Sequence, residues 1–254
     1  MLRARKRFGQ NFLVDTGIIQ KIIGSLDIKQ HDRIVEIGPG RGALTQSLSD
    51  SRCELTLIEI DRDLTAELSI CFPDAGLINQ DVMTIDFNAL AAKSPLRIIG
   101  NLPYNISTPL LFKLFDSGEY IQDMHFMLQR EVVDRMTALP STKAYGRLSV
   151  MAQLHCQTEK LFEVPPQAFS PRPKVQSAII RLTPNNKATD VDKKLLENIL
   201  IQAFSMRRKT IRNALRKFLT ADELESLHLN PQLRPENLTI DDYLACTRFV
   251  GDRP

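Results

Sequence analysis

Four consecutive residues with complementary chemistry, Asn101, Leu102, Pro103 and Tyr104, follow an apolar run in the segment IIGNLPYNIS. The side-chain carbonyl of Asn101 and the backbone carbonyl of Leu102 can accept two amino hydrogens, because Pro103 biases Leu102 away from helical backbone. The ring of Tyr104 offers a surface on which a base can stack. The four residues predict a pocket for alkylation of an exocyclic amine, whose nitrogen attacks a sulfonium methyl without prior deprotonation. A strand-ending turn with a packed tyrosine is the alternative.

A glycine-rich loop precedes this segment in the chain: VEIGPGRGALT places Gly38, Gly40 and Gly42 between an expected strand and an expected helix. Glycine lets the backbone turn tightly and approach a ligand closely. The third glycine follows the second too soon for the dinucleotide fingerprint, and Pro39 removes a backbone donor that a pyrophosphate could use. The loop therefore favours a less anionic ligand, such as the methionine portion of S-adenosylmethionine, over a purely structural turn.

Two acidic residues end the next two expected strands. Glu59 closes LTLIE about 20 residues after the glycines, where a carboxylate can accept hydrogen bonds from both ribose hydroxyls of a nucleoside. Asp81 closes GLINQD and can accept a hydrogen bond from the adenine amino group. Glu59 as a helix cap and Asp81 as a turn residue are the structural alternatives. The regular spacing of the loop and both carboxylates predicts a nucleoside cofactor.

Short apolar runs alternate with segments of helical spacing, which is typical of a parallel, doubly wound sheet. The expected strands are residues 33–38, 54–61, 76–81, 96–102, 124–128 and, as the last strand, 177–184. We predict an α/β fold of the Rossmann-like, S-adenosylmethionine-dependent methyltransferase type, with a mostly parallel sheet and a small C-terminal all-helical domain. The expected boundary lies near residue 185, which gives a catalytic domain over 1–185 and a helical RNA- or ribosome-binding domain over 186–254.

Basic residues gather in two places although the net charge is only +3. One cluster opens the chain with Arg3, Arg5, Lys6 and Arg7. The other, RRKTIRNALRK, contains no acidic residue and includes Arg207, Arg208, Lys209, Arg212 and Arg216. Clusters of this kind indicate contact with the phosphates of a nucleic acid, and solvated helix faces are the alternative. Residues 192–219 are expected to form one continuous helix. The spacing by four predicts that Arg208, Arg212 and Arg216 share one face of it.

Composition places further bounds on the function. The 254 residues have an ordinary globular composition and no apolar run long enough for a membrane helix. The basic amino end lacks the apolar core of a secretory signal. The four cysteines stand alone, without the paired spacing of a zinc site or a disulfide framework. We therefore expect a cytoplasmic protein that binds neither a metal nor a membrane.

Six segments together resemble the small-subunit ribosomal RNA adenine dimethyltransferases: RKRFGQNFL, VEIGPGRGALT, GNLPYNISTPLLF, YGRLSVMAQ, PPQAFSPRPKVQSAIIRL and RRKTIRNAL. The similarity runs over nearly the whole chain. It implies transfer of four methyl groups from S-adenosylmethionine to two adjacent adenosines near the 3′ end of the small-subunit RNA, two on each N6. The implied partner is ribosomal RNA within the small subunit or its precursor, and the implied role is in subunit biogenesis. We expect a monomer, which fits a protein that docks on a large particle.

The resemblance also implies roles for individual residues. Those expected to contact the cofactor are Asn11, Leu13, Gly38, Gly40, Glu59, Asp81 and Asn101. Phe169 would sandwich the target base opposite Tyr104, and ordinary core packing is its alternative. The chain departs from the family pattern at Arg41, where an apolar residue is expected, and at Gly42, where alanine is expected. Neither departure should matter to a site built from the backbone.

Four other functions share some of these features. A dehydrogenase fits the loop, the acidic residue and the sheet, but neither the glycine spacing nor the Asn-Leu-Pro-Tyr segment. A DNA adenine methyltransferase would share the pocket but needs a larger base-reading domain. Large-subunit RNA methyltransferases of the resistance type are closer, although Leu102 and RRKTIRNAL favour the small-subunit family. An assembly factor that methylates only incidentally remains open.

Overall fold

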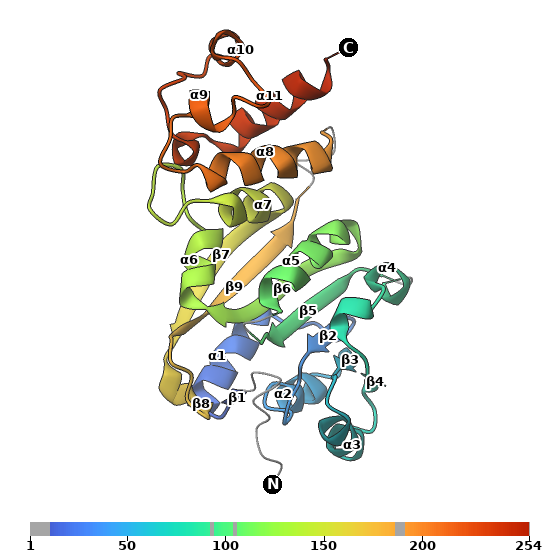
Figure 1. Cartoon of the computed structure of the whole chain (residues 1–254). Helices are drawn as coiled ribbons and strands as arrows, with labels where there is room; N and C mark the ends of the chain where they lie inside the picture. The colour runs from blue at the N-terminus through green and yellow to red at the C-terminus, as the bar shows by residue number, and fades with distance from the viewer. Residues whose placement is uncertain (1–10, 92–93, 104–105, 186–190, 254) are drawn as a thin grey trace. The chain divides into compact units, whose positions relative to one another are not determined.

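The computed structural model describes residues 11–91, 94–103, 106–185 and 191–253 (Figure 1). Contacts divide the chain into two units, one with residues 1–133 and 159–184 and the other with residues 134–158 and 185–254. Helices and strands of the described residues are α1 (Thr16–Leu26), α2 (Thr45–Asp50), α3 (Arg62–Cys71), α4 (Phe87–Leu90), α5 (Ser107–Asp116), α6 (Arg130–Met136), α7 (Arg147–His155), α8 (Lys193–Ser205), α9 (Ile211–Ala214), α10 (Ala221–Ser226), α11 (Ile240–Gly251), β1 (Phe12–Leu13), β2 (Arg33–Ile37), β3 (Glu54–Ile58), β4 (Gly76–Ile78), β5 (Leu96–Asn101), β6 (Ile121–Gln129), β7 (Cys156–Val164), β8 (Phe169–Ser170) and β9 (Ser177–Pro184).

Among the described residues, seven strands form one sheet in the order β4-β3-β2-β5-β6-β9-β7. The pairs β3–β4, β2–β3, β2–β5 and β5–β6 are parallel, and β6–β9 is antiparallel. The α/β fold with a mostly parallel sheet is therefore confirmed. The sequence pattern does not predict edge strand β7. Its residues are mostly half-buried, so it lacks the continuous apolar run of a central strand.

Strand order reverses between β2 and β5, and this reversal creates the functional edge of the sheet. From β2 the chain continues to β3 and β4 on one side, and β5 then pairs with the other side of β2. In the register, Ile37 at the end of β2 lies opposite both Ile58 of β3 and Gly100 of β5. The loop after β2 and the segment after β5 therefore emerge side by side. Such a switch point is where open α/β sheets bind ligands.

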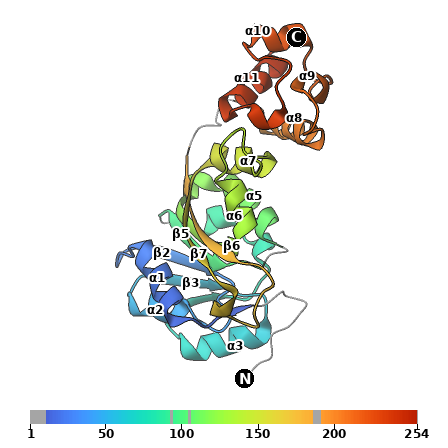
Figure 2. The same ribbon diagram turned by 90° about the vertical axis from the view of Figure 1, so that its left-hand side faces the viewer.

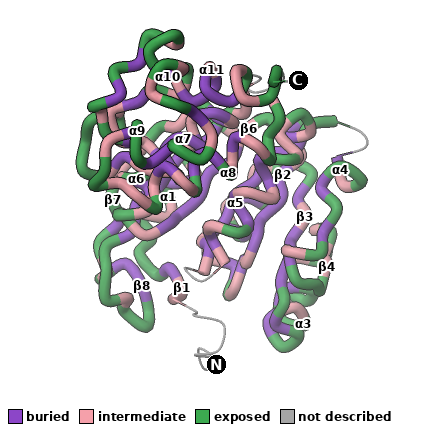
Figure 3. The backbone as a smooth tube through the Cα atoms, turned by 45° about the horizontal axis from the view of Figure 1, so that its top comes forward, coloured by how far each residue is buried: buried purple, intermediate pink, exposed green. Residues whose placement is uncertain are grey.

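Both faces of the sheet are covered, which explains the apolar strands. Helices α1, α2 and α3 bury side chains such as Ile22, Leu48 and Leu68 in one cluster with strand residues of one face. Helix α5 lies on the other side, and its Leu110, Leu111 and Leu114 are buried there (Figure 2). The central strands are accordingly buried along their length, whereas edge strand β4 is only partly buried (Figure 3).

A buried ionic network joins the amino-terminal ends of the central strands β5 and β6 to α1. The guanidinium of Arg97, at the start of β5, donates to Asp32 at 2.6 Å and to Asp123 of β6 at 2.8 and 3.0 Å. It also donates to the backbone carbonyl of Leu26 at 2.6 Å. A buried charge needs such partners, because desolvation otherwise outweighs what it contributes. The network ties the end of α1 to β5 and β6.

The second unit contains more of the chain than the boundary at residue 185 predicted. Residues 134–158, which we expected in the catalytic domain, group by contacts with the C-terminal helices. Aromatic packing is the physical reason. The buried ring of Tyr145 meets Phe204 of α8 edge-on at 6.3 Å, and Phe204 lies 5.9 Å from Tyr243 of α11. The backbone N–H of Ser141 also donates to the carbonyl of Glu236 at 2.7 Å.

Gly100 permits the close approach of β5 to β2. A Cβ on Gly100 would lie 2.6 Å from the backbone carbonyl oxygen of Ile37, so alanine cannot fit unless the two strands separate. We expect Gly100→Ala to lower the free energy of unfolding by about 1–3 kcal/mol. Gly24→Ala is the matched control: nothing lies within 4 Å of a Cβ there, and alanine in a helix should be neutral or stabilising. Chemical denaturation measures both, and equal stability of the two variants would contradict the close approach.

Candidate active site

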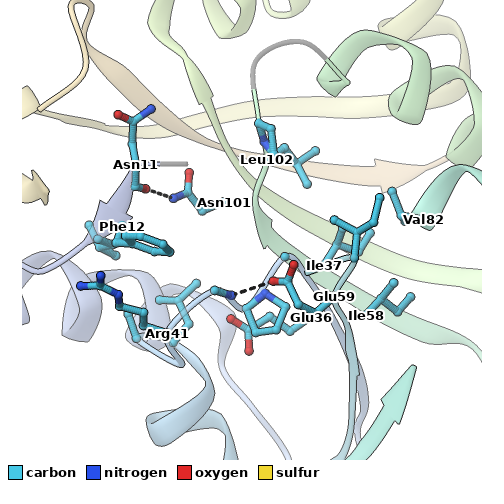
Figure 4. A pocket seen from close by; sticks show the side chains of 18 of the residues that line it. Asn11, Phe12, Glu36, Ile37, Arg41, Ile58, Glu59, Val82, Asn101 and Leu102 are labelled. Atoms are coloured by element: carbon cyan, nitrogen blue, oxygen red, sulfur yellow. Dashed lines mark hydrogen bonds between the residues drawn. The ribbon is translucent and has the colours of Figure 1, made fainter. Parts of the chain in front are cut away.

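A pocket of about 550 Å³ lies at the carboxyl ends of β2, β3 and β5. It is lined by the loops that follow these strands and by the residues around β1 (Figure 4). Nine residues singled out from the sequence line it: Asn11, Leu13, Gly38, Gly40, Glu59, Asp81, Asn101, Leu102 and Pro103. The sheet therefore brings together segments that are as much as 90 residues apart in the chain.

The glycine loop depends on left-handed backbone. Gly38, Gly40 and Gly42 have φ angles of 67°, 60° and 79°, a region that side chains with a Cβ rarely adopt. Space is also limited at the third position, because a Cβ on Gly42 would lie 2.7 Å from the ring of Phe72. The glycine found where the family pattern has alanine is thus demanded by this chain's own packing.

The Glu59 carboxylate organises the loop and remains able to bind a ligand. One oxygen accepts a hydrogen bond from the Gly40 N–H at 3.2 Å, and the other accepts from the Asp61 N–H at 2.9 Å. Burial raises the pKa of Glu59, and these hydrogen bonds oppose that increase. A carboxylate can accept about four hydrogen bonds, so acceptor capacity is left on the side that lines the pocket. The arrangement fits a ligand with two neighbouring hydroxyls.

Asp81 both closes a turn and lines the pocket. Its Oδ1 accepts from the Met83 N–H at 2.9 Å and so caps the 3₁₀ helix Val82–Thr84. Asp81 therefore has the turn-closing role given above as its structural alternative, and this role does not prevent it from binding a ligand. The side chain is exposed at the pocket wall, where a carboxylate oxygen can accept from an amino group.

Asn101 ends β5 with its carboxamide at the pocket. Its Nδ2 donates to the backbone carbonyl of Asn11 at 3.0 Å, and the side chain is half-buried (Figure 4). Leu102 turns its side chain into the core, and its N–H donates to the Met127 carbonyl at 3.3 Å. Within the described residues, neither Oδ1 of Asn101 nor the carbonyl of Leu102 accepts a hydrogen bond. Both acceptors required for an amino group are thus present. Tyr104, the expected stacking ring, lies outside the described residues.

Phe169 belongs to the core in this structure. It lies in β8 opposite Leu13 of β1, is 3% exposed, and packs in the cluster beneath the glycine loop. It does not line the pocket as described. The core-packing alternative therefore describes its present environment, and the base-sandwiching role stays a prediction.

Glu36 is a pocket residue that we did not predict. The sequence alone could have indicated this residue, because a carboxyl group within the apolar strand RIVEI is unusual. Its side chain is 2% exposed and lines the pocket, and it accepts a hydrogen bond from the Thr45 hydroxyl at 2.7 Å. Burial, aided by repulsion from Glu59, raises the pKa of Glu36 to about 7. With Glu59 and Asp81, three acidic side chains line the pocket, which favours a cationic ligand.

The five basic residues of residues 207–216 that were predicted to contact phosphates divide into two groups. The guanidinium of Arg207 is committed to the fold: it pairs with Glu236 at 2.6 Å and donates to the carbonyl of Lys143 at 2.7 Å. The others are exposed and available for contact with phosphates: Arg208, Lys209, Arg212 and Arg216. The expectation of one continuous helix was wrong, because α8 ends at Ser205 and α9 begins at Ile211. A turn closed by the Lys209 N–H on the Met206 carbonyl separates them.

Neither a membrane-spanning helix nor a cluster of metal ligands occurs among the described residues. No described helix is long and apolar enough to span a membrane. No group of three or more histidine, cysteine, aspartate or glutamate side chains among the residues with described positions is arranged to hold a metal ion. The basic residues of the amino end, Arg3, Arg5, Lys6 and Arg7, lie outside the described part of the chain.

The raised pKa of Glu36 predicts a pH-dependent stability. The folded protein retains the Glu36 proton at pH values where the unfolded chain releases it, so the free energy of unfolding should fall as pH rises from 4.5 to about 7. Glu36→Gln keeps an acceptor for the Thr45 hydroxyl and removes this titration. Relative to wild type, the variant should gain on the order of 3 kcal/mol across that window, as measured by denaturation at about pH 5 and about pH 8. A constant difference would contradict the assignment.

Known proteins similar to this chain are ribosomal RNA methyltransferases. The family model "Ribosomal RNA adenine dimethylase" matches residues 1–251. "Ribosomal RNA small subunit methyltransferase A" of Hahella chejuensis is 50% identical, with 99% of this chain and 94% of that protein covered. The protein of the same name from Coxiella burnetii (strain RSA 493 / Nine Mile phase I) is also 50% identical, with 97% and 98% covered.

Two solved structures of methyltransferases have a similar fold. A dimethyladenosine transferase from Plasmodium falciparum superposes with a TM-score of 0.83 at 27% identity, covering 94% of this chain and 97% of the other. The 23S rRNA methyltransferase ErmE shares the fold, with a TM-score of 0.72 at 23% identity over 95% of this chain and all of that one. The match of the family model over almost the whole chain and the 50% identical relatives show that the protein belongs to the ribosomal RNA adenine dimethylase family.

Proposed function

We propose that the protein transfers methyl groups from S-adenosylmethionine to the N6 atoms of two adjacent adenosines near the 3′ end of small-subunit ribosomal RNA. The product is N6,N6-dimethyladenosine, and the reaction serves small-subunit biogenesis in the cytoplasm. The observation that carries the proposal is the Asn101 carboxamide, which lies beside the acidic pocket with an acceptor oxygen available. Family membership supports both the substrate and the donor.

The pocket residues fit the methyl donor. Glu59 is oriented to accept from ribose hydroxyls, Asp81 from an adenine amino group, and the glycine loop brings the backbone close to the methionine portion. Asp81, Glu59 and, when ionised, Glu36 would complement the positive charge of the donor, which in turn favours their ionised forms. When bound, S-adenosylmethionine supplies an electrophilic methyl group. No residue of the pocket is required to bind a metal for this reaction.

The target amine must also be made able to attack the methyl group. Its lone pair is delocalised into the purine ring, and acceptors on its hydrogens favour the pyramidal nitrogen that attacks the methyl group. The Asn101 side-chain carbonyl and the Leu102 backbone carbonyl serve as these acceptors. A neutral acceptor suffices, because the proton can leave after the methyl has been transferred. The second methylation needs room for the first methyl group beside one of the acceptors.

The target base must leave its stack before it can reach Asn101, at a cost of a few kcal/mol. Stacking on Tyr104 and, after a rearrangement of the core beneath β8, on Phe169 would offset part of this cost, at roughly 1–3 kcal/mol per ring. Contacts with phosphates supply the remainder without reading sequence. We assign these contacts to Arg208, Lys209, Arg212 and Arg216, with the protein acting as a monomer on the small subunit or its precursor.

Removal of the Asn101 carboxamide tests the reaction. With unmethylated small subunits and labelled donor, the wild-type protein should yield two adjacent dimethyladenosines when modified bases are mapped. Asn101→Ala should lose about 10²–10³-fold in kcat, the effect of deleting one preorganised polar group, while still binding subunits. Asn88→Ala, an exposed asparagine of α4, is the matched control and should retain activity. Full activity of Asn101→Ala would reject the mechanism, and normal assembly with this inactive variant would make binding the main role.

Charge reversal tests the RNA contacts. Arg208→Glu combined with Arg212→Glu should weaken RNA binding strongly and leave donor affinity intact. The slope of log affinity against log salt should also fall by about 1.5, because two contacts with phosphates are lost. Lys193→Glu combined with Lys194→Glu, at the start of α8, changes the net charge equally and is the control. Filter binding over a salt series measures this, and equal transfer rates in the wild type and the first double variant would reject the assignment.

A further inference from the structure

The Asn101 carboxamide makes one described hydrogen bond, and that bond reaches a distant part of the chain. Nδ2 donates to the backbone carbonyl oxygen of Asn11 at 3.0 Å (Figure 4). A backbone carbonyl can only accept, so the nitrogen end of the carboxamide must face it. Turning the carboxamide over would break this bond and bring two oxygens together. The bond therefore leaves Oδ1, the acceptor, for a ligand in the pocket.

The Asn11 carbonyl is itself held by the chain that follows it. We call residues 11–14 the amino-terminal strap. Its strand β1 pairs antiparallel with β8, so that Phe12 lies opposite Ser170. The Val14 N–H donates to the Ala168 carbonyl at 2.8 Å, and the Leu13 side chain is buried in the core. The strap is therefore anchored to the segment 168–170 through Phe12, Leu13 and Val14, the three residues that follow Asn11.

The same strap packs directly on the glycine loop. The guanidinium of Arg41 lies 4.4 Å from the centre of the Phe12 ring. A Cβ on Gly40 would be only 3.2 Å from that ring, so the ring rests against the loop backbone. Cation–π contacts of this kind are worth about 0.5–1 kcal/mol at exposed sites. Arg41, which departs from the family pattern, thus has a structural partner in this chain.

We propose that the backbone carbonyl of Asn11 is a positioning group that orients the Asn101 acceptor for methyl transfer. The strap contacts the loop expected to bind the methyl donor through Phe12 and the acceptor through Asn11, so it couples the two halves of the site. The inference rests on the proposed function, because it concerns the acceptor used in that reaction. It goes further by giving the strap a part in turnover, beyond the contact that Asn11 and Leu13 are expected to make with the donor.

Weakening this one carbonyl tests the proposal. Incorporation of phenyllactic acid at Phe12 converts the peptide bond between residues 11 and 12 into an ester, which keeps every side chain and makes the Asn11 carbonyl a poorer acceptor. The ester also removes the Phe12 N–H from the pair of β1 with β8, as the same replacement removes a backbone N–H at the control position. The matched control is the same replacement at Phe249 within α11 of the second unit. We expect kcat at saturating donor to fall about fivefold at position 12, the factor for roughly one hydrogen bond, and to stay at the wild-type value at position 249. Donor affinity, measured by calorimetry, should change less than kcat.

A second readout is independent of activity. In ¹⁵N-labelled protein, the Asn101 side-chain amide protons should exchange with solvent more slowly than those of the exposed Asn88, and faster once the ester is present. Unchanged kcat and unchanged exchange in the Phe12 ester would overturn the proposal. If the wild-type protein methylates no RNA, the proposed function fails, whereas the exchange rates still decide whether Asn11 orients Asn101.

Asn101→Asp provides a test that keeps the natural backbone. Its carboxylate cannot donate to the Asn11 carbonyl, but its protonated form can. Activity relative to wild type should therefore be low at high pH and recover as pH falls, a profile that a purely structural role would not produce. Activity equal to wild type at high pH would overturn the positioning role, because no donor to Asn11 would then be needed.

Discussion

The close parallel pairing of β2 with β5 is the constraint on which the site depends. Ile37 and Gly100 lie opposite each other, and the missing side chain at Gly100 allows the backbones to approach. The glycine loop leaves β2 immediately after Ile37, and Asn101 follows Gly100 directly. One register thus places the expected donor loop beside the amine acceptor. The buried Arg97 network supports this register by joining the start of β5 to β6 and to the end of α1.

Much of the site could be predicted because its residues follow strands in the sequence. Gly38, Glu59 and Asn101 each come directly after an apolar run, and Asp81 follows β4 by three residues. Parallel strands bring their carboxyl ends to one edge. Contacts between distant segments could not be predicted in the same way. Nothing in the local sequence shows that Phe12 rests on Gly40 or that the Asn11 carbonyl meets Asn101. These contacts depend on the pairing of two-residue strands β1 and β8, which are too short to give a periodic pattern.

The errors in the fold have similar causes. Residues 134–158 join the second unit because the Tyr145 ring packs in its aromatic core, and such packing has no signature in the spacing of neighbouring residues. The continuous helix expected through residue 216 stops at Ser205 although no glycine or proline follows. There tertiary contacts outweigh helix propensity: Arg207 is tied to Glu236, and the Ile211 N–H donates to the Leu233 carbonyl at 2.7 Å.

The acidic pocket also explains why a neutral carboxamide suits position 101. Glu36 and Glu59 already have raised pKa values because both are buried, and each added negative charge would increase the cost of ionising the others. A carboxylate at position 101 would add a further negative charge to a pocket already lined by Glu36, Glu59 and Asp81. It would also face the Asn11 carbonyl oxygen without a hydrogen to offer it. An amide satisfies that carbonyl and leaves its own oxygen for the pocket. A neutral residue at position 101 thus suits the charge of the pocket and the strap, as well as the amine chemistry proposed for it.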